Sequence, residues 1–275
     1  MQHFEVLPKQ KGLVRLQHNP CKLLDFAELR LDRDEIYAGS TGDREAMFVV
    51  LGGRVTVEAG RERFDRIGGR ANPFQGRPWA VYLPPGTGYS VAASAGGSAE
   101  VAVCSAVADR VEGAVPFLIT PAEVQTGVWG ADNFARRYHE ILVNTDRKVQ
   151  RLIVGETYTP SGNWSTYPPH KHEEDRLPES AFMEEIYYFR VAPPEGFGLT
   201  MLYTDARDID EMHRVVDRSV LKIARGYHTV VSAPGYTTYY LWFLAGHHRT
   251  QAPVLDPSVG WVQKAVGMLR REEGL

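Results

Sequence analysis

The sequence predicts an all-β protein of two tandem domains, followed by one helix at the C-terminus. The length of 275 residues suits two domains of moderate size. The 26 Gly and 17 Pro are typical of a turn-rich β protein. An internal repeat is the third observation: Glu45 and Glu185 each open an apolar run, and Tyr89 and His228 follow them after 44 and 43 residues, respectively. We therefore expect a duplicated β-barrel.

Short runs of β-branched and aromatic residues recur between Gly, Pro and Asp residues along the chain. Runs of this length and composition, bounded by turn residues, predict strands. The clearest lie at residues 46–51, 54–58, 80–83, 100–107, 151–157, 185–191, 199–203 and 239–244. Many short strands indicate a sandwich or barrel rather than a helix bundle.

The last predicted element is a helix over residues 259–269. The tripeptide at 256–258, Asp-Pro-Ser, is an N-terminal start signal. Apolar residues then recur on one helical face, at Val259, Val262, Val266 and Leu269. We expect the boundary between the domains near the Gly- and Asn-rich stretch 127–134, with an N-terminal domain at 1–125 and a C-terminal domain at 126–275.

Composition excludes several classes of partner. A formal net charge of −3 and a pI near 6.3 provide no basic surface for nucleic acid. No apolar run approaches the roughly 20 residues of a membrane-spanning helix, so we expect a soluble protein that binds no membrane. Cys21 and Cys104 are too few for a disulfide framework, and the first residues lack the apolar stretch of a secretory signal. A cytoplasmic location fits these observations.

Histidines in the second half predict a metal site. His170 and His172 are separated by one residue, so both imidazoles project to the same side if the segment is extended. His228 returns after a length suited to a few antiparallel strands, and Glu185 opens a strand between them. Two or three histidines with one carboxylate suit one divalent ion: zinc, manganese, iron, cobalt or nickel.

Alternatives to this ligand set remain open at this point. A His-x-His pair on a polar loop is equally compatible with two exposed surface residues that bind no metal. Glu174, Asp175 and Glu184 compete with Glu185 for the carboxylate role, and Glu185 is preferred because it occupies the place of Glu45 in the repeat. The remaining histidines of the second half are expected to be structural or exposed: His139, His213, His247 and His248.

Three segments of the second half carry a resemblance to a known family. NWSTYPPHKHEED, EEIYYFRV and GYHTVVSAPGYTTYYLWFLAG together resemble the 5-deoxy-glucuronate isomerases of bacterial myo-inositol catabolism. The resemblance implies two tandem cupin (jelly-roll) domains and interconversion of 5-deoxy-D-glucuronate with 2-deoxy-5-keto-D-gluconate. The related ketol-isomerases of 4-deoxy-5-ketouronates have a similar pattern and bind zinc, which places the ligands on His170, His172, Glu185 and His228.

Two departures from the family pattern concern the substrate. Thr229 stands where the family is expected to have Pro, and residues 131–135 fit loosely. In the first half, Tyr89 occupies the place of His228, and nothing matches His170 or His172. The resemblance therefore implies a metal-free N-terminal cupin domain that contributes packing and pocket closure.

Isomerisation of an aldose to a ketose moves hydrogen between C2 and C1; a divalent ion acting as a Lewis acid can stabilise the negative charge that develops, and a proton shuttle must lie near both carbons. Glu156 and Tyr240 are the candidates for the shuttle, and Tyr187 is the candidate that orients sugar hydroxyls. Arg136 is the first candidate for the substrate carboxylate and Arg225 the second, because a guanidinium binds a carboxylate through two hydrogen bonds. Each is equally compatible with an ordinary core or surface role.

The ligand set alone admits other activities. An iron-containing cupin with three histidines and one glutamate can be a dioxygenase, and a cupin can bind a sugar without turnover. The substrate can also be a related deoxy-ketouronate. A small sugar acid is thus the expected partner, and the sequence leaves open whether the chain forms a homo-oligomer.

Overall fold

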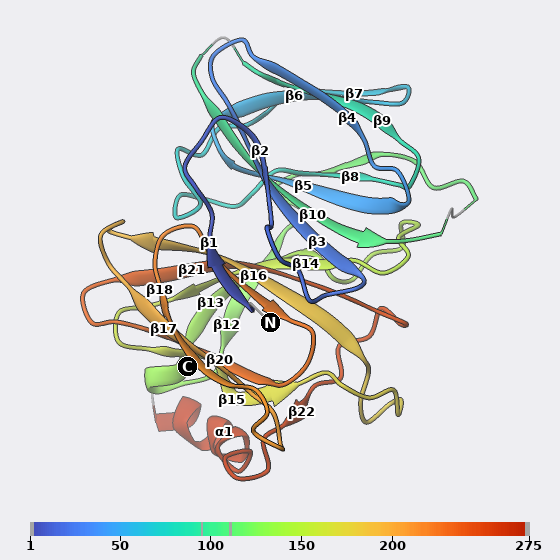
Figure 1. The fold of residues 1–275 in the computed structure, drawn as a ribbon. Coiled ribbons are helices and arrows are strands. Elements are labelled where there is room, and N and C mark those ends of the chain that lie inside the picture. The colour runs from blue at the N-terminus through green and yellow to red at the C-terminus, as the bar shows by residue number, and fades with distance from the viewer. Residues whose placement is uncertain (1–2, 95, 110–111, 273–275) are drawn as a thin grey trace.

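The computed structural model describes residues 3–94, 96–109 and 112–272, with side chains as far as residue 269. In these residues the chain forms two β-barrels, each made of two antiparallel sheets, and one α-helix near the C-terminus (Figure 1). The predicted all-β class, with two jelly-roll barrels and a C-terminal helix, is confirmed. No helix in the described part of the chain is long and apolar enough to cross a membrane.

The first barrel packs a six-stranded sheet, β11-β8-β5-β10-β3-β2, against a four-stranded sheet, β4-β9-β6-β7. Apolar side chains alternate with outward-facing ones, as in β6, where Val55, Val57 and Ala59 point into the core. The strands are β2 (Gly12–Arg15), β3 (Leu24–Leu31), β4 (Ile36–Ser40), β5 (Arg44–Gly52), β6 (Arg54–Ala59), β7 (Glu62–Gly68), β8 (Ala80–Leu83), β9 (Gly88–Ala93), β10 (Ala99–Val107) and β11 (Phe117–Ile119).

The second barrel packs a seven-stranded sheet, β1-β19-β16-β21-β14-β13-β12, against a five-stranded sheet, β18-β17-β20-β15-β22. Strand β1 (Phe4–Val6) precedes the first barrel in sequence, yet it pairs with β19 of the second. The other strands are β12 (Gln125–Trp129), β13 (Arg136–Leu142), β14 (Ile153–Thr159), β15 (Trp164–Lys171), β16 (Met183–Ala192), β17 (Gly198–Tyr203), β18 (Asp210–Val215), β19 (Ser219–Ile223), β20 (Tyr227–Ser232), β21 (Thr237–Gly246) and β22 (Val254–Leu255).

The larger sheets of the two barrels share a hydrophobic core. It contains Phe26 and Met47 from the first barrel and Tyr188 and Phe243 from the second. The rings of Phe26 and Tyr188 stack with centroids 4.9 Å apart. Each larger sheet is therefore covered on both faces, and β5, β16 and β21 are buried along almost their whole length.

Two carboxylates cross between the barrels in a reciprocal arrangement. Glu45 of β5 accepts hydrogen bonds from the backbone N–H groups of residues 150–152, which lead into β14. Glu184 of β16 accepts them from residues 22–24, which lead into β3. We refer to these two arrangements as the carboxylate clamps. Because β5 corresponds to β16 and β3 to β14, the clamps relate the barrels by an approximate twofold repeat.

The clamps correct the predicted alignment of the repeat by one residue. Glu45 corresponds to Glu184, so that Ala46, and not Glu45, stands at the position of Glu185. A shift of one residue along a strand moves a side chain to the other face of the sheet. Glu45 and Glu184 consequently face the core between the barrels, and Ala46 and Glu185 face the interior of their own barrel.

Strand β3 is absent from the predicted strands because charges interrupt its apolar pattern. Its sequence is LDFAELRL, and Glu28 within it is fully buried and ion-paired with Arg218 of the second barrel. Sequence patterns assign charged residues to the solvent-exposed face, so they do not predict a strand in which a charged residue is buried against a partner of opposite charge.

The C-terminal helix, α1 (Val262–Glu272), begins three residues after the predicted start at 259. The predicted start signal forms a turn: Asp256 accepts hydrogen bonds from the backbone N–H and the hydroxyl group of Ser258. Hydrogen bonds between residues three apart then link residues 259–264. The turn therefore occupies residues 257–261 and leads directly into the regular helix at Val262.

Candidate metal centre

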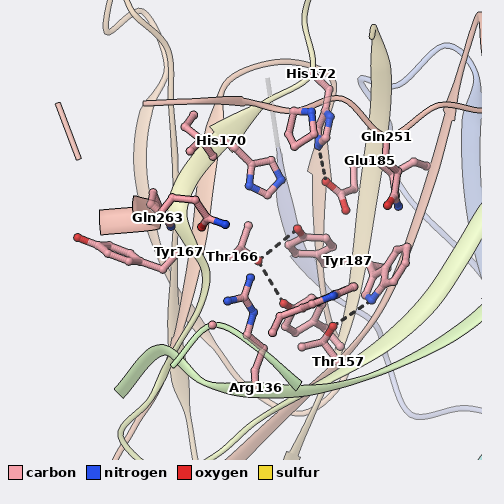
Figure 2. Close-up of a pocket in the computed structure, with 18 of the residues that line it drawn as sticks. Arg136, Thr157, Thr166, Tyr167, His170, His172, Glu185, Tyr187, Gln251 and Gln263 are labelled. Carbon is pink, nitrogen blue, oxygen red and sulfur yellow. Dashed lines mark hydrogen bonds and ion pairs between the residues drawn. The ribbon is translucent and has the colours of Figure 1, made fainter. Parts of the chain in front are cut away.

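Four side chains from the two sheets of the second barrel converge in its interior; Figure 2 shows three of them, His170, His172 and Glu185. His170 lies in β15, His172 follows that strand, Glu185 lies in β16 and His228 lies in β20. The pairing of β15 with β20 sets His170 opposite His228. One nitrogen or carboxylate oxygen from each residue lies within 4.8 Å of all the others. The predicted ligand set is thus brought together by three strands that are far apart in sequence.

The chemistry of this group fits a divalent metal ion. Buried polar atoms almost always have a hydrogen-bond partner. Glu185 Oε2, His228 Nε2 and both ring nitrogens of His172 have none among the described residues. Glu185 Oε2 lies 3.0 Å from His228 Nε2 and 3.6 Å from His172 Nε2, but neither contact is a hydrogen bond. One cation would satisfy all of these atoms.

Electrostatics favour the protonation states that metal binding requires. Loss of hydration lowers the pKa of His170 well below its usual range, and His228 and His172 lower it further, so the imidazole is neutral. Burial by itself would raise the pKa of Glu185, but His172 and His228 beside it lower that pKa below its usual range. A neutral imidazole and an ionised carboxylate are the forms that ligate metals.

A carboxylate next to the cluster connects two of the ligand-bearing segments. Glu173 directly follows His172 and accepts a hydrogen bond from the backbone N–H of Gly226 at 2.8 Å. Gly226 lies two residues before His228. The loop after β15 and the start of β20 are therefore held together, which fixes the separation of His172 and His228.

The competing carboxylates point elsewhere. Glu184 forms its clamp with residues 22–24 on the other side of the sheet. Glu174 pairs with Arg176 at 2.9 Å, and Asp175 Oδ2 lies 2.6 Å from His247 Nδ1. The histidines that were expected to be structural or exposed also lie outside the cluster: His139, His213, His247 and His248.

A cavity of about 610 Å³ adjoins the four residues. His170, His172 and Glu185 line one end of it, and Arg136 approaches from the opposite end (Figure 2). Aromatic and hydroxyl side chains make up much of the wall between them: Trp129, Thr157, Thr166, Tyr187, Tyr240 and Trp242. The cavity thus has a candidate cation site at one end and a fixed positive charge at the other.

Tyr240 and Tyr187 both face this cavity, as their predicted roles require. The Tyr240 hydroxyl lies 2.5 Å from Ser165 Oγ and 3.1 Å from Thr166 Oγ1. The Tyr187 hydroxyl lies 3.5 Å from Thr166 Oγ1. Burial raises the pKa of Tyr240, opposed by the charge of Arg136 and by its hydroxyl partners. Tyr240 is therefore a neutral phenol in contact with a short chain of hydroxyl groups.

Glu156 departs from its predicted place. Its neighbour Thr157 lines the cavity, and strand alternation turns Glu156 toward the core between the barrels. There its carboxylate accepts hydrogen bonds from Arg70 at 2.6 Å and Tyr239 at 2.9 Å and lies 3.1 Å from His139 Nδ1. Burial would raise the pKa of Glu156, but Arg70 and His139 lower it to about 2. This fixed carboxylate lies outside the cavity, contrary to the predicted proton-transfer role.

The two candidate arginines occupy different environments. Arg136, at the start of β13, lines the cavity, and its guanidinium carbon lies 5.8 Å from the centroid of a Trp129 ring. Arg225 is not among the cavity-lining residues; its side chain is 47% exposed and pairs with Asp208. Of the two predicted carboxylate receptors, only Arg136 is therefore within the cavity.

Two further residues that line the cavity were not predicted from the sequence. Gln251 lies in the loop after β21, and Gln263 lies in the first turn of α1. Neither belongs to a motif, and exposed glutamines carry no periodic signal. The only available signal was the amphipathic C-terminal helix, whose partner surface the sequence does not identify.

The first barrel contains no comparable cluster of potential ligands among the described residues. In the first barrel Tyr89 pairs with Gly39, as His228 pairs with His170 in the second, so Tyr89 corresponds to His228 and Gly39 to His170. Ala46 corresponds to Glu185, because 43 residues separate each of them from the following Tyr89 or His228. A Cβ atom added to Gly39 would lie 2.8 Å from the Tyr89 hydroxyl oxygen, so the tyrosine fills the space of the missing side chain. The four equivalent positions hold Gly39, Thr41, Ala46 and Tyr89.

Comparison with protein families agrees with this arrangement. A family model described as the KduI/IolB family matches residues 8–262. A 5-deoxy-glucuronate isomerase of Geobacillus kaustophilus is 40% identical over 235 residues, which are 85% of this chain and 83% of the relative. The 5-deoxy-glucuronate isomerase of Bacillus subtilis strain 168 is 35% identical over 252 residues, 90% and 91% of the two chains.

Solved structures show the same architecture. The crystal structure of an IolB-like protein from Salmonella typhimurium is similar with a TM-score of 0.88 and 31% identity, covering 96% of this chain and all of that one. The oxalate decarboxylase of Lactobacillus farciminis matches with a TM-score of 0.70 at 10% identity, covering 99% of this chain and 93% of that one. At that identity the second match shows the cupin fold alone.

Proposed function

Because the chain belongs to the KduI/IolB family, we propose that it is an isomerase that interconverts 5-deoxy-D-glucuronate and 2-deoxy-5-keto-D-gluconate. The observation that carries the proposal is the cavity with a cluster of four potential ligands at one end and Arg136 at the other. Relatives that match most of the chain carry the name 5-deoxy-glucuronate isomerase. The proposal places the reaction in this cavity.

His170, His172, Glu185 and His228 are the proposed ligands of one divalent ion, with zinc as the first choice. Their unpartnered buried atoms support this assignment. Such an ion supplies Lewis acidity to the carbonyl and hydroxyl oxygens of the sugar. The proposal includes a metal-binding unit at 126–275 and a metal-free unit at 1–125, supported by Gly39 and Tyr89 in place of two ligands.

Tyr240 is the proposed proton shuttle between the two reacting carbons. Its hydroxyl faces the cavity and is held by hydrogen bonds with Ser165 and Thr166. The neutral phenol would give its own proton to one carbon as it takes up the proton released by the other, so that it ends the reaction in its starting state. Tyr187 orients the hydroxyl groups of the sugar next to the ligand cluster. Glu156 has no part in this chemistry because its carboxylate is held by Arg70 between the barrels.

Arg136 is the proposed receptor for the carboxylate of the sugar acid. A guanidinium can bind a carboxylate through two charge-assisted hydrogen bonds. Binding at this end would orient the open-chain sugar with its C1 and C2 toward the ligand cluster. An anionic substrate is thereby preferred over a neutral sugar of the same size.

The test is an anaerobic assay of metal-loaded protein with 5-deoxy-D-glucuronate and, separately, with a 4-deoxy-5-ketouronate, followed by NMR of the products. We expect conversion of 5-deoxy-D-glucuronate to 2-deoxy-5-keto-D-gluconate without oxygen. Turnover of the ketouronate alone would assign the other substrate. In a parallel assay under air, turnover that occurs only with oxygen uptake would identify a dioxygenase. Saturable binding without product in either assay would identify a sugar-binding protein. The proposal also places the enzyme in the cytoplasm, consistent with its two unpaired cysteines.

A further inference from the structure

One wall of the cavity is formed by the C-terminal segment, residues 251–266, which joins the last long strand to helix α1. Five of its residues line the cavity, two from α1 and three from the preceding extended chain: Gln251, Pro253, Leu255, Gln263 and Val266. Helix α1 lies beside β15 and β22 at the outer side of the second barrel (Figure 1). The segment therefore closes a side of the cavity that the strands leave open.

This wall is attached to the strand that carries His170. In β22, Leu255 pairs with His170 of β15. The backbone N–H of Asp256 donates to the carbonyl oxygen of Pro169 at 2.9 Å, and its carboxylate accepts a hydrogen bond from Tyr203 at 2.6 Å. Hydrogen bonds at Leu255 and Asp256 thus fix the position of this wall relative to the ligand cluster.

Two side-chain amides project from the segment into the cavity. Gln263 approaches from the side of His170, and Gln251 from the side of Glu185 (Figure 2). Neither amide forms a hydrogen bond with another residue that the structure describes. A primary amide offers two N–H donors and one carbonyl acceptor. The two glutamines can therefore both donate to and accept from hydroxyl groups.

We propose that Gln251 and Gln263 bind hydroxyl groups of the sugar acid and make the C-terminal segment the specificity-determining wall of the cavity. The inference rests on the proposed function for the identity of the substrate. Arg136 binds the charged end, the ligand cluster binds the reacting end, and the glutamines bind the hydroxyl groups between them. Neutral amides suit this task because a carboxylate in the wall would repel the anionic substrate.

The test uses the intact metal-loaded protein with Gln263→Ala, Gln251→Ala and Gln263→Glu. Met268→Ala is the matched control, because Met268 lies in α1, is 70% exposed and does not line the cavity. Two readouts are compared: KM for 5-deoxy-D-glucuronate, and the Kd of D-glucuronate from an NMR titration. Metal content by elemental analysis and helicity by circular dichroism report on folding.

We expect each alanine variant to raise both constants roughly threefold to tenfold, the effect of losing one hydrogen bond between neutral groups. Metal content and kcat should remain within about twofold of wild type. Gln263→Glu should weaken binding more than Gln263→Ala, and added salt should reduce the difference because it screens the repulsion. Met268→Ala should leave all values unchanged.

A change below threefold in either alanine variant would remove that glutamine from the proposal. Loss of metal together with affinity would mean that the segment only supports the fold, and the proposal would be overturned. If wild-type protein does not isomerise the deoxy-uronate, the proposed function fails, whereas the Kd of D-glucuronate still decides whether the glutamines bind sugar hydroxyls.

Discussion

At the scale of single residues, two adjacent carboxylates in β16 have unrelated surroundings. Glu185 faces the interior of the second barrel and joins the histidine cluster. Glu184 faces the first barrel and accepts three backbone hydrogen bonds. The difference follows from the twofold alternation of side chains along a strand. One position in the sequence therefore separates the proposed metal ligand from a structural clamp.

His228→Ala should lower metal content and isomerase activity together. Wild-type protein should hold about one divalent ion per chain, because the four ligands form a single group. Removal of one ligand leaves an incomplete coordination sphere, so we expect metal affinity to fall by more than about tenfold. Elemental analysis after mild dialysis measures the content. Tyr89→Phe, at the equivalent position of the first barrel, should change neither quantity; full metal retention by His228→Ala would refute the ligand assignment.

Arg136→Ala should weaken substrate binding without loss of metal. We expect KM for the deoxy-uronate to rise at least about tenfold, which corresponds to about 1.4 kcal/mol. Steady-state kinetics with parallel elemental analysis separate binding from metal loss. Arg225→Ala is the control, since Arg225 pairs with Asp208 outside the cavity. An unchanged KM in Arg136→Ala would show that the carboxylate binds elsewhere in the cavity.

At the scale of elements, the carboxylate clamps set where one barrel begins relative to the other. Each carboxylate receives the N–H groups of three successive residues that lead into a strand of the other barrel. Glu45 is additionally bound by the Tyr82 hydroxyl at 2.7 Å. Because β14 starts from the segment held by Glu45, this clamp also positions the strand that carries Thr157 into the cavity.

Glu45→Gln should destabilise the protein by about 2–4 kcal/mol. The amide would place an N–H donor against backbone N–H donors inside a buried site and would remove the charge that strengthens those bonds. Urea denaturation of the metal-free protein gives the free energy of unfolding. Glu58→Gln is the surface control: its side chain is 53% exposed and paired only with other surface groups, so we expect a change within about 0.5 kcal/mol. Equal effects of the two substitutions would contradict the role of the clamp.

At the scale of the whole molecule, the two barrels form one packed unit. Their larger sheets share a hydrophobic core, and β1 crosses from the N-terminus to the sheet of the second barrel. Buried ion pairs lie in the same interface: Arg70 of the first barrel with Glu156, and Glu28 with Arg218 of the second. A barrel expressed alone would expose this core and leave those charges without partners, so metal binding is best measured on the intact chain.

The Arg70 and Glu156 pair predicts a specific loss of stability in acid. The folded-state pKa of Glu156 is about 2, below its ordinary value of 4.5. A depressed pKa contributes stability that is complete above the ordinary value and is lost as the pH falls through about 2. Glu156→Gln should therefore be less stable than wild type at pH 6, by at most about 3 kcal/mol from this source.

The difference in stability between wild type and Glu156→Gln should shrink as the pH is lowered from about 4.5 toward 2, because the wild-type Glu156 carboxylate then becomes protonated. Urea midpoints measured on both proteins in EDTA, across this range, provide the comparison without a contribution from metal. A difference that does not vary with pH would show that Glu156 is not ionised in the folded protein.

Local patterns in the sequence determined the class of fold and the composition of the candidate site. Short apolar runs between turn residues predict strands because a strand needs only a few residues with suitable side chains. The spacing of His170 and His172 predicts two imidazoles on the same side because that property depends on the backbone of one segment. The separation of Glu185 from His228 nearly equals that of Glu45 from Tyr89, and it predicts two similar barrels because a duplicated domain keeps the spacing between equivalent strands.

Only the tertiary structure decided which face each strand presents and which distant segments meet. Glu156 and Tyr240 are equally plausible catalysts in sequence, yet pairing of β14 with β21 turns the first toward Arg70 and leaves the second in the cavity. The placement of Gln263 beside the ligand cluster depends on how the C-terminal segment docks on β15. Such outcomes depend on register and on contacts between residues far apart in sequence, and a shift of one residue along a strand reverses them.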